Sequence, residues 1–144
     1  MKKQLLLGDE AIALGALHAG LSGVYAYPGT PSTEITEFIQ GNALAKERGV
    51  HSRWSTNEKT AMEAALGMSF MGKRALVCMK HVGMNVCADP FVNSGMTGVN
   101  GGVVVLWLTT PRCTPLRMNR TLVSTASLQW CPFSSPAISR RPTT

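Results

Sequence analysis

The residue best placed to do chemistry is an acid at the start of a predicted helix. Glu58 follows the polar run Ser55-Thr56-Asn57, and small or apolar residues then recur at helical spacing, at Ala61, Ala64, Ala65 and Met68. A carboxylate held at a rigid helix end in a dry cleft can accept and return a proton. The spacing also has a purely structural explanation, because Ser55-x-x-Glu58 fits a capping box in which the acid only satisfies a backbone N–H group.

The elements around Glu58 alternate between helix and strand. The patterns predict strands over 23–27, 50–54, 74–79 and 101–106, with helices over 8–18, 31–48 and 58–72 between them. Gly8 or Asp9 is the expected cap of the first helix, and Thr30 the cap of the second, with Pro31 at its first position. This alternation is typical of an α/β fold, in which helices cover a parallel sheet.

Three polar, glycine-bearing turns are predicted to lie together. They are Pro28-Gly29-Thr30-Pro31, Ser55-Thr56-Asn57-Glu58 and Lys80-His81-Val82-Gly83, and each follows the carboxyl end of a predicted strand. The carboxyl ends of parallel strands meet at one edge of the sheet, where ligands bind in such folds. The sequence therefore predicts a site at this edge.

The same turns carry a resemblance to a known family. Over residues 5–106 the chain resembles the pyrimidine-binding domain at the start of the large (alpha) subunit of indolepyruvate ferredoxin oxidoreductase, in the thiamine-diphosphate-dependent pyruvate:ferredoxin oxidoreductase superfamily. The matching motifs are Leu7-Gly8-Asp9-Glu10-Ala11, Ala26-Tyr27-Pro28-Gly29-Thr30-Pro31-Ser32-Thr33-Glu34, Asn57-Glu58-Lys59, Met79-Lys80-His81-Val82-Gly83-Met84-Asn85 and Ala88-Asp89-Pro90.

The resemblance implies roles for five residues. Glu58 would share a proton with N1′ of the aminopyrimidine ring of thiamine diphosphate, and Lys80, His81 and Gly83 would line the cofactor cleft. Thr30 would face the carboxylate or keto oxygen of the substrate. Structural alternatives remain beside these roles. Thr30 could be only a helix cap, His81 only a turn residue, and Gly83 a residue that a turn with φ > 0 requires.

The resemblance also implies an enzyme that oxidatively decarboxylates arylpyruvates to acyl-CoA. Its partners would be a 2-oxoacid, coenzyme A, ferredoxin and a smaller oxidoreductase subunit. The magnesium ion and the 4Fe-4S clusters would belong to parts of the family chain beyond this sequence, so we expect the chain alone to be inactive. No metal site is predicted within it, because Cys78, Cys87, Cys113 and Cys131 match no zinc or cluster spacing.

The basic charge belongs to the last segment of the chain. Residues 1–106 hold nine Lys or Arg and eight Asp or Glu, whereas residues 107–144 add five Arg and no acid to reach the net charge of +6. Of these last 38 residues, 17 are Ser, Thr or Pro. Two interpretations are open, a disordered tail and a slipped reading frame. Read one base earlier, the codons of residues 107–113 are compatible with VADDPSM, an acidic and more family-like sequence.

The sequence also leaves two other classes of function open. One is a small-molecule or nucleotide-binding α/β module without catalysis, although no GxGxxG or P-loop glycine pattern is present. The other is a nucleic-acid binder, which would rest on the arginines of the tail alone. No segment approaches the ~20 apolar residues of a membrane span, and Asp9 and Glu10 interrupt the apolar run Leu5-Leu6-Leu7. We therefore expect a cytoplasmic protein without a membrane or nucleic-acid partner.

Overall fold

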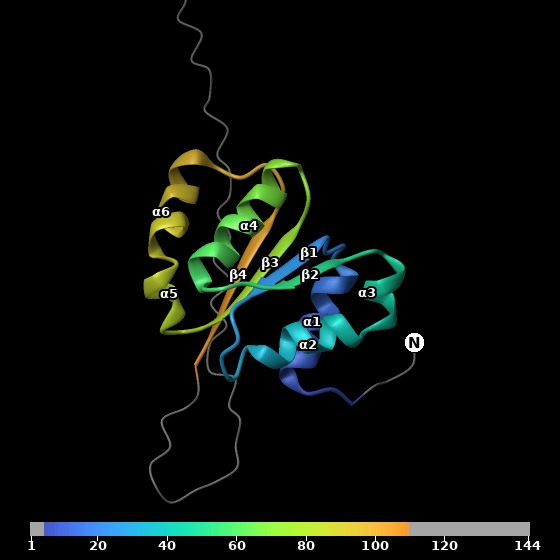
Figure 1. The fold of residues 1–144 in the computed structure, drawn as a ribbon. Coiled ribbons are helices and arrows are strands. Elements are labelled where there is room, and N and C mark those ends of the chain that lie inside the picture. Colours follow the sequence, from blue (N-terminus) through green and yellow to red (C-terminus); the bar gives the residue numbers. More distant parts are fainter. Residues whose placement is uncertain (1–4, 110–144) are drawn as a thin grey trace, which may run out of the picture.

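The chain forms a parallel sheet with helices on both faces. The computed structural model describes residues 5–109 (Figure 1). Their elements, in chain order, are α1 (Gly8–His18), β1 (Gly23–Ala26), α2 (Thr33–Gly41), α3 (Ala43–Glu47), β2 (His51–Trp54), α4 (Glu58–Phe70), β3 (Ala75–Lys80), α5 (Gly83–Val86), α6 (Ala88–Thr97) and β4 (Val103–Leu108). The strand order is β2-β1-β3-β4, and every pairing is parallel, as predicted.

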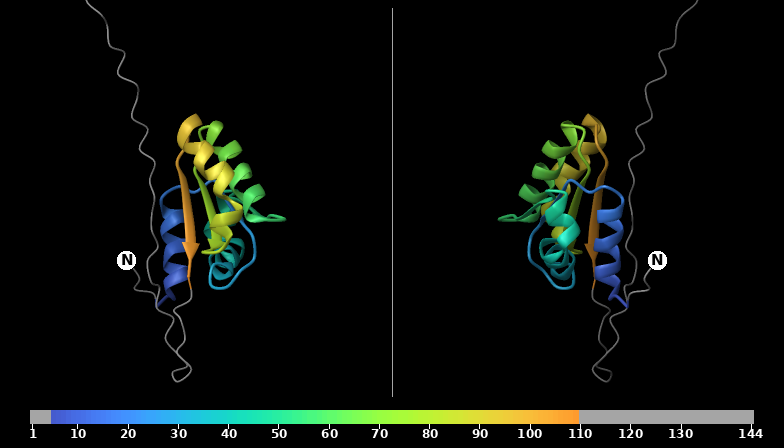
Figure 2. Two further views of the ribbon diagram at one scale, coloured as in Figure 1. Left: turned by 90° about the vertical axis from the view of Figure 1, so that its left-hand side faces the viewer. Right: turned by 90° about the vertical axis from the view of Figure 1, so that its right-hand side faces the viewer.

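Alternate residues of the central strands enter two separate cores, because successive side chains of a strand point to opposite faces. On one face, Val24, Leu76 and Leu106 pack with apolar residues of α1, α2 and α3. On the other, Tyr25, Val77 and Val105 pack with α4 and with Cys87. Figure 2 shows this layering, with α1 on one side of β4 and with α4 and α6 on the other. The central strands β1 and β3 are thus buried on both faces, which explains their almost continuous apolar sequences.

Some predicted boundaries were wrong. The helix predicted to run to Arg48 is two helices, because the side chain of Asn42 accepts a hydrogen bond from the N–H of Leu44 (2.9 Å) and starts α3. The first helix begins at Gly8, after Leu7, and not after a cap at Gly8 or Asp9; the N–H of Leu7 donates to Glu10 Oε2 (2.9 Å).

The last strand ends at Leu108, two residues beyond the predicted Leu106. Trp107 and Leu108 continue the pairing with Met79 and Lys80, and Leu108 is buried in the core beside α1 and α2. The apolar pair therefore extends the strand across the point where the charge pattern changes. The predicted basic tail beyond Thr109 lies outside the described residues.

Among residues 5–109, no helix is both long enough and apolar enough to cross a membrane.

Candidate functional site

The three predicted turns lie at one edge of the sheet. Ala26, the last residue of β1, is paired with Trp54 on one side and with Cys78 on the other, so the loop after β1 and the start of α4 leave the sheet at the same level. β3 continues two residues further, to Lys80, before α5 begins. In Figure 1 the loop after β1 and the first residues of α4 and α5 gather at the same end of the sheet. This is the edge where parallel α/β folds bind ligands.

The cap of α4 does not involve Glu58. Asn57 is the N-cap residue: its Oδ1 accepts from the N–H of Thr60 (2.8 Å), and its own N–H donates to Thr60 Oγ1 (3.3 Å). The capping box therefore joins Asn57 and Thr60, and the predicted alternative with Ser55 and Glu58 is wrong. A Thr at the third helical position performs the reciprocal contact that Glu or Gln usually makes, which is why the Ser-x-x-Glu spacing was misleading.

Glu58 is a buried acid without a hydrogen bond in the described part of the chain. It is the first residue of α4, only 9% of its surface is exposed, and no donor among residues 5–109 contacts its carboxylate. Its oxygens are not among the fully buried side-chain atoms that lack a partner, so the carboxylate still reaches solvent. The acid is thus available to a hydrogen-bonding group from outside these residues.

Gly83 lies directly against the side chain of Glu58. A Cβ atom built on Gly83 would lie 2.6 Å from Cγ and 2.7 Å from Cδ of Glu58, and its nearest neighbour would be Oε1. Real Cβ atoms essentially never approach other atoms within 3.0 Å. Gly83 does not have a positive φ, so the alternative that a turn requires glycine here is wrong. The position lacks a side chain because Glu58 occupies that space.

The thiol of Cys87 is also a neighbour of Glu58. Burial, together with the negative charge of Glu58, raises the pKa of Cys87 to about 11. Cys87 is fully buried and free. Its pKa keeps the thiol neutral near pH 7, so Cys87 is a neutral wall of the site and not a nucleophile. No local pattern indicated the proximity of Cys87 to Glu58.

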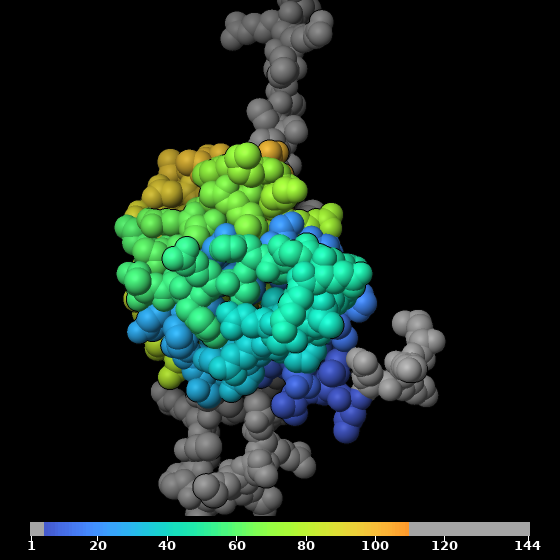
Figure 3. Space-filling view, turned by 45° about the vertical axis from the view of Figure 1, so that its right-hand side comes forward, coloured from blue at the N-terminus to red at the C-terminus, as the bar shows by residue number. Residues whose placement is uncertain are grey.

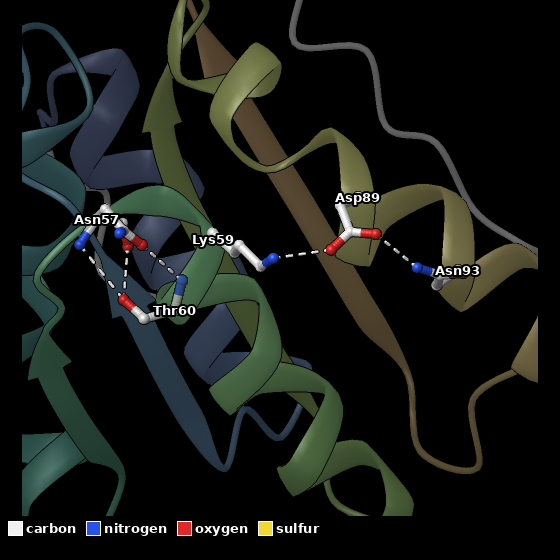
Figure 4. A network of polar contacts seen from close by, with 5 residues as sticks. All are labelled: Asn57, Lys59, Thr60, Asp89 and Asn93. Atoms are coloured by element: carbon white, nitrogen blue, oxygen red, sulfur yellow. Dashed lines mark hydrogen bonds and ion pairs between the residues drawn. The ribbon is translucent and has the colours of Figure 1, made fainter.

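A polar network joins the start of α4 to α6 (Figure 4). Lys59 Nζ forms an ion pair with Asp89 Oδ2 at 2.8 Å, and Asn93 Nδ2 donates to Asp89 Oδ1 at 2.8 Å. These contacts lower the pKa of Asp89, mainly through the hydrogen bond from Lys59, and raise the pKa of Lys59. The network places Lys59, the neighbour of Glu58, over the helix that follows α5.

Thr30 is exposed and is not a helix cap. The helix begins at Thr33 after Ser32, and the turn before it is closed by the Ser32 hydroxyl, which donates to the carbonyl of Gly29 (2.7 Å). The N–H of Gly29 in turn donates to Thr33 Oγ1 (3.0 Å). With no capping role, Thr30 presents its hydroxyl at the surface of this turn.

Lys80 and His81 occupy different environments at the end of β3. Lys80 is half-buried, and its Cβ would lie 3.4 Å from a Cβ built on Gly29, so the loop after β1 reaches β3 here. His81 is exposed, and its backbone N–H donates to the carbonyl of Leu108 (2.9 Å). The structure thus brings Glu58 and Gly83 into contact and places Lys80 beside Gly29. Among residues 5–109, no hydrogen bond or ion pair joins Thr30 or His81 to Glu58.

A separate groove of about 690 Å³ is formed by other residues. It is lined mostly by apolar residues from the start of the chain, α1, α2 and α3: Leu5, Leu6, Leu14, His18, Phe38, Asn42, Ala43 and Leu44. Figure 3 shows the first described residues, in dark blue, beside the cyan surface of α2 and α3. None of the predicted site residues lines this groove.

Comparison with known proteins gives relatives among the oxidoreductases of indolepyruvate and other 2-oxoacids. The chain is 50% identical over 105 residues to indolepyruvate oxidoreductase subunit IorA of Thermococcus kodakarensis. The aligned residues make up 73% of this chain and 16% of that protein. The corresponding subunit of Pyrococcus horikoshii is 49% identical over the same length. That of Methanothermobacter marburgensis is 37% identical over 132 residues, or 92% of this chain and 21% of the relative. The chain thus spans about a sixth to a fifth of the length of these relatives. No protein-family model matches it.

A solved structure has the same fold. The 2-oxoglutarate:ferredoxin oxidoreductase from Magnetococcus marinus, with 2-oxoglutarate, coenzyme A and succinyl-CoA bound, aligns with 76% of this chain and 18% of its own at a TM-score of 0.67. The sequences are 21% identical in this alignment. The predicted α/β fold, a parallel sheet flanked by helices, is confirmed.

Proposed function

We propose that this chain, which is homologous to a segment of the indolepyruvate oxidoreductase alpha subunit, provides the acid-bearing half of a thiamine-diphosphate site. One observation carries the proposal. Glu58 is buried at the ligand-binding edge of the sheet, the helix cap does not use it, and its carboxylate has no hydrogen-bond donor among residues 5–109. An acid in this position fits a ligand that brings its own hydrogen-bonding nitrogen.

The residues of the chain have distinct tasks in this proposal. Thiamine diphosphate, when bound, supplies an aminopyrimidine ring whose N1′ shares a proton with a carboxylate, and a thiazolium carbon that attacks 2-oxoacids. Glu58 would hold that proton on its carboxylate, at a helix start where only 9% of the residue surface is exposed. Gly83 and Cys87 leave the carboxylate without a competing charge.

Lys80, His81 and Thr30 belong to the cleft in the same proposal. Lys80 lies at the end of β3, next to the loop after β1, and His81 is exposed one residue further. Thr30 is exposed on that loop and offers a hydroxyl to the carboxylate or keto oxygen of a 2-oxoacid.

The reaction of the whole protein would be the oxidation of an arylpyruvate by ferredoxin. The bond between the keto carbon and the carboxylate would break and release carbon dioxide, the acyl group would form a thioester with coenzyme A as the thiol loses its proton, and the two electrons would pass to ferredoxin. The groups that bind the diphosphate with its metal, and the clusters that carry electrons, would come from parts that this chain does not include. A smaller subunit would complete the assembly.

Ligand-dependent melting of the chain tests the proposal. Thiamine diphosphate should raise the melting temperature of the 144-residue chain, since a ligand present at 100 times its Kd stabilises the folded state by about 2.7 kcal/mol. Glu58→Gln should abolish the increase while leaving the unliganded melting temperature close to that of the parent. Glu63→Gln, the same substitution at an exposed acid of the same helix, is the matched control and should keep the increase.

Two results would contradict the proposal. If ATP or NAD raises the melting temperature and thiamine diphosphate does not, the chain is the nucleotide-binding module considered above. If thiamine diphosphate stabilises Glu58→Gln as strongly as the parent, the cofactor binds without this acid and the role of Glu58 is wrong.

A further inference from the structure

The place of the Glu58 carboxyl group depends on an element other than the helix that carries it. The three atoms nearest to a Cβ built on Gly83 all belong to the Glu58 side chain, at its Oε1, Cγ and Cδ. Gly83 begins α5, which follows β3, whereas Glu58 begins α4, which follows β2. In the sheet, β1 lies between β2 and β3. The two residues meet because α4, which follows β2, packs over β1 and β3.

We propose that Gly83 is a positioning residue for Glu58. The missing side chain at Gly83 leaves the space that the carboxyl group occupies, so the segment after β3 determines where the acid points. The proposal deepens the proposed function, and it relies on that function only for the task of the acid. The contact itself is independent of any cofactor.

Two neighbouring features support the same arrangement. The N–H of Cys87 donates to the carbonyl of Gly83 (3.0 Å), so the two residues lie one turn apart. The negative charge of Glu58 contributes to the raised pKa of Cys87. The ion pair between Lys59 and Asp89 holds the first turn of α4 against α6, directly after α5. Together they keep the segment from Gly83 to Cys87 against the carboxyl group.

The contact predicts how the protein would respond to a methyl group at Gly83. The atoms in its way are the outer part of a flexible side chain and not backbone. A methyl group can therefore displace the carboxyl group by side-chain rotation while the fold persists. Since Gly83 does not have a positive φ, alanine fits its backbone conformation.

A double-mutant cycle tests the proposal on the 144-residue chain. Gly83→Ala is made in the parent and in Glu58→Ala, and the unfolding equilibrium of each variant is measured with denaturant. We expect alanine at position 83 to lower the folded-to-unfolded ratio in the parent relative to its effect in Glu58→Ala, by at least about threefold, as for residues in contact. The cycle cancels the general effect of replacing a helical glycine. Gly95→Ala in α6, where a Cβ meets nothing within 4 Å, is the control and should have the same effect in both backgrounds.

A spectroscopic readout separates positioning from stability. The ¹³C shift of the Glu58 carboxyl carbon should move in Gly83→Ala and stay unchanged in Gly95→Ala. Equal effects of Gly83→Ala in both backgrounds, together with an unchanged Glu58 shift, would overturn the proposal. If Gly83→Ala fails to fold, folding of the double variant supports the proposal, whereas failure of both variants contradicts it. Coupling without any stabilisation by thiamine diphosphate would support the positioning role and reject the proposed function.

Discussion

Asn57 and Thr60 close the first turn of α4 reciprocally, through hydrogen bonds of 2.8 Å and 3.3 Å, and leave the intervening acid unused. Capping is therefore performed by side chains other than the one that we propose for proton exchange. Because these tasks are separate, single substitutions can distinguish them.

The first prediction compares Asn57 with Glu58. Asn57→Ala removes the acceptor of the Thr60 N–H group and should cost about 1 kcal/mol of stability. Glu58→Gln keeps the shape of the side chain and the cap, so its free energy of unfolding should remain within about 0.5 kcal/mol of the parent. Denaturant unfolding of both variants provides the measurement. A larger loss in Glu58→Gln than in Asn57→Ala would mean that the acid itself supports the helix start.

The second prediction concerns the turn after β1. Ser32 is buried and donates to Gly29, whereas Thr30 is exposed. Ser32→Ala should lower the free energy of unfolding by about 1 kcal/mol through the lost hydrogen bond, and Thr30→Ala should leave it nearly unchanged. Thermal melts of the two variants test this contrast. A destabilised Thr30→Ala would indicate a structural role for this threonine and weaken its proposed role toward a substrate.

The third prediction is a pH dependence at Asp9. One oxygen of Asp9, Oδ1, is buried without a partner in the described part of the chain, and burial, followed by the charge of Glu34, raises the pKa of this carboxyl group. The folded state therefore binds this proton more tightly than the unfolded state. The resulting stabilisation is fully present below the unfolded pKa of 3.8 and is lost as the pH rises through the folded value. Asp9→Asn should raise the melting temperature near pH 7, and the gain should shrink below about pH 4.

The fourth prediction is a pH dependence at Asp89, where the pKa is lowered and not raised. The hydrogen bond and charge of Lys59 lower the pKa of Asp89, so the contribution of this acid is present above 3.8 and is lost as the pH falls through the folded value. Asp89→Asn should lower the melting temperature slightly near pH 7 and have no effect near pH 2. High salt should reduce the difference, because both side chains are exposed and screened. An equal loss at both pH values would assign the effect to helix packing and not to charge.

The fifth prediction concerns the gene. The codons of residues 107–144, read one base earlier, should encode an acidic sequence that starts as VADDPSM. β4 does not distinguish the two frames, because both place apolar residues at positions 107 and 108, inside the strand. The DNA sequence decides between them. Stop codons within that frame would contradict the frame slip and show that residues 107–144 are a basic tail encoded as such.

Much of the fold followed from local sequence patterns. Local patterns placed all four strands to within two residues at each end, with continuous apolar runs at β1, β3 and β4, and the three turns meet at one edge. The break at Asn42 was missed because the apolar spacing of Phe38, Leu44 and Ala45 continues across it. An internal cap interrupts a helix without changing that spacing.

The site was only partly accessible from sequence. The residues of the three turns were identified, but the contact between Gly83 and Glu58 depends on the crossing of α4 over the sheet, which no local pattern contains. The neighbourhood of Cys87 was missed for the same reason. The misassigned cap shows a different limit, since Ser55 and Asn57 are both good caps and only the backbone conformation selects between them.

The strand order also has a consequence for synthesis on the ribosome. β1 and β2 are made first, and β3, which brings Gly83, joins β1 on the other side. A two-stranded sheet alone is marginally stable, so the nascent chain has no place for Glu58 until β3 and α5 have emerged. At ~5–20 residues per second this interval lasts on the order of one to five seconds. During it, the apolar face of α4 remains available to chaperones, and the acid is still in water.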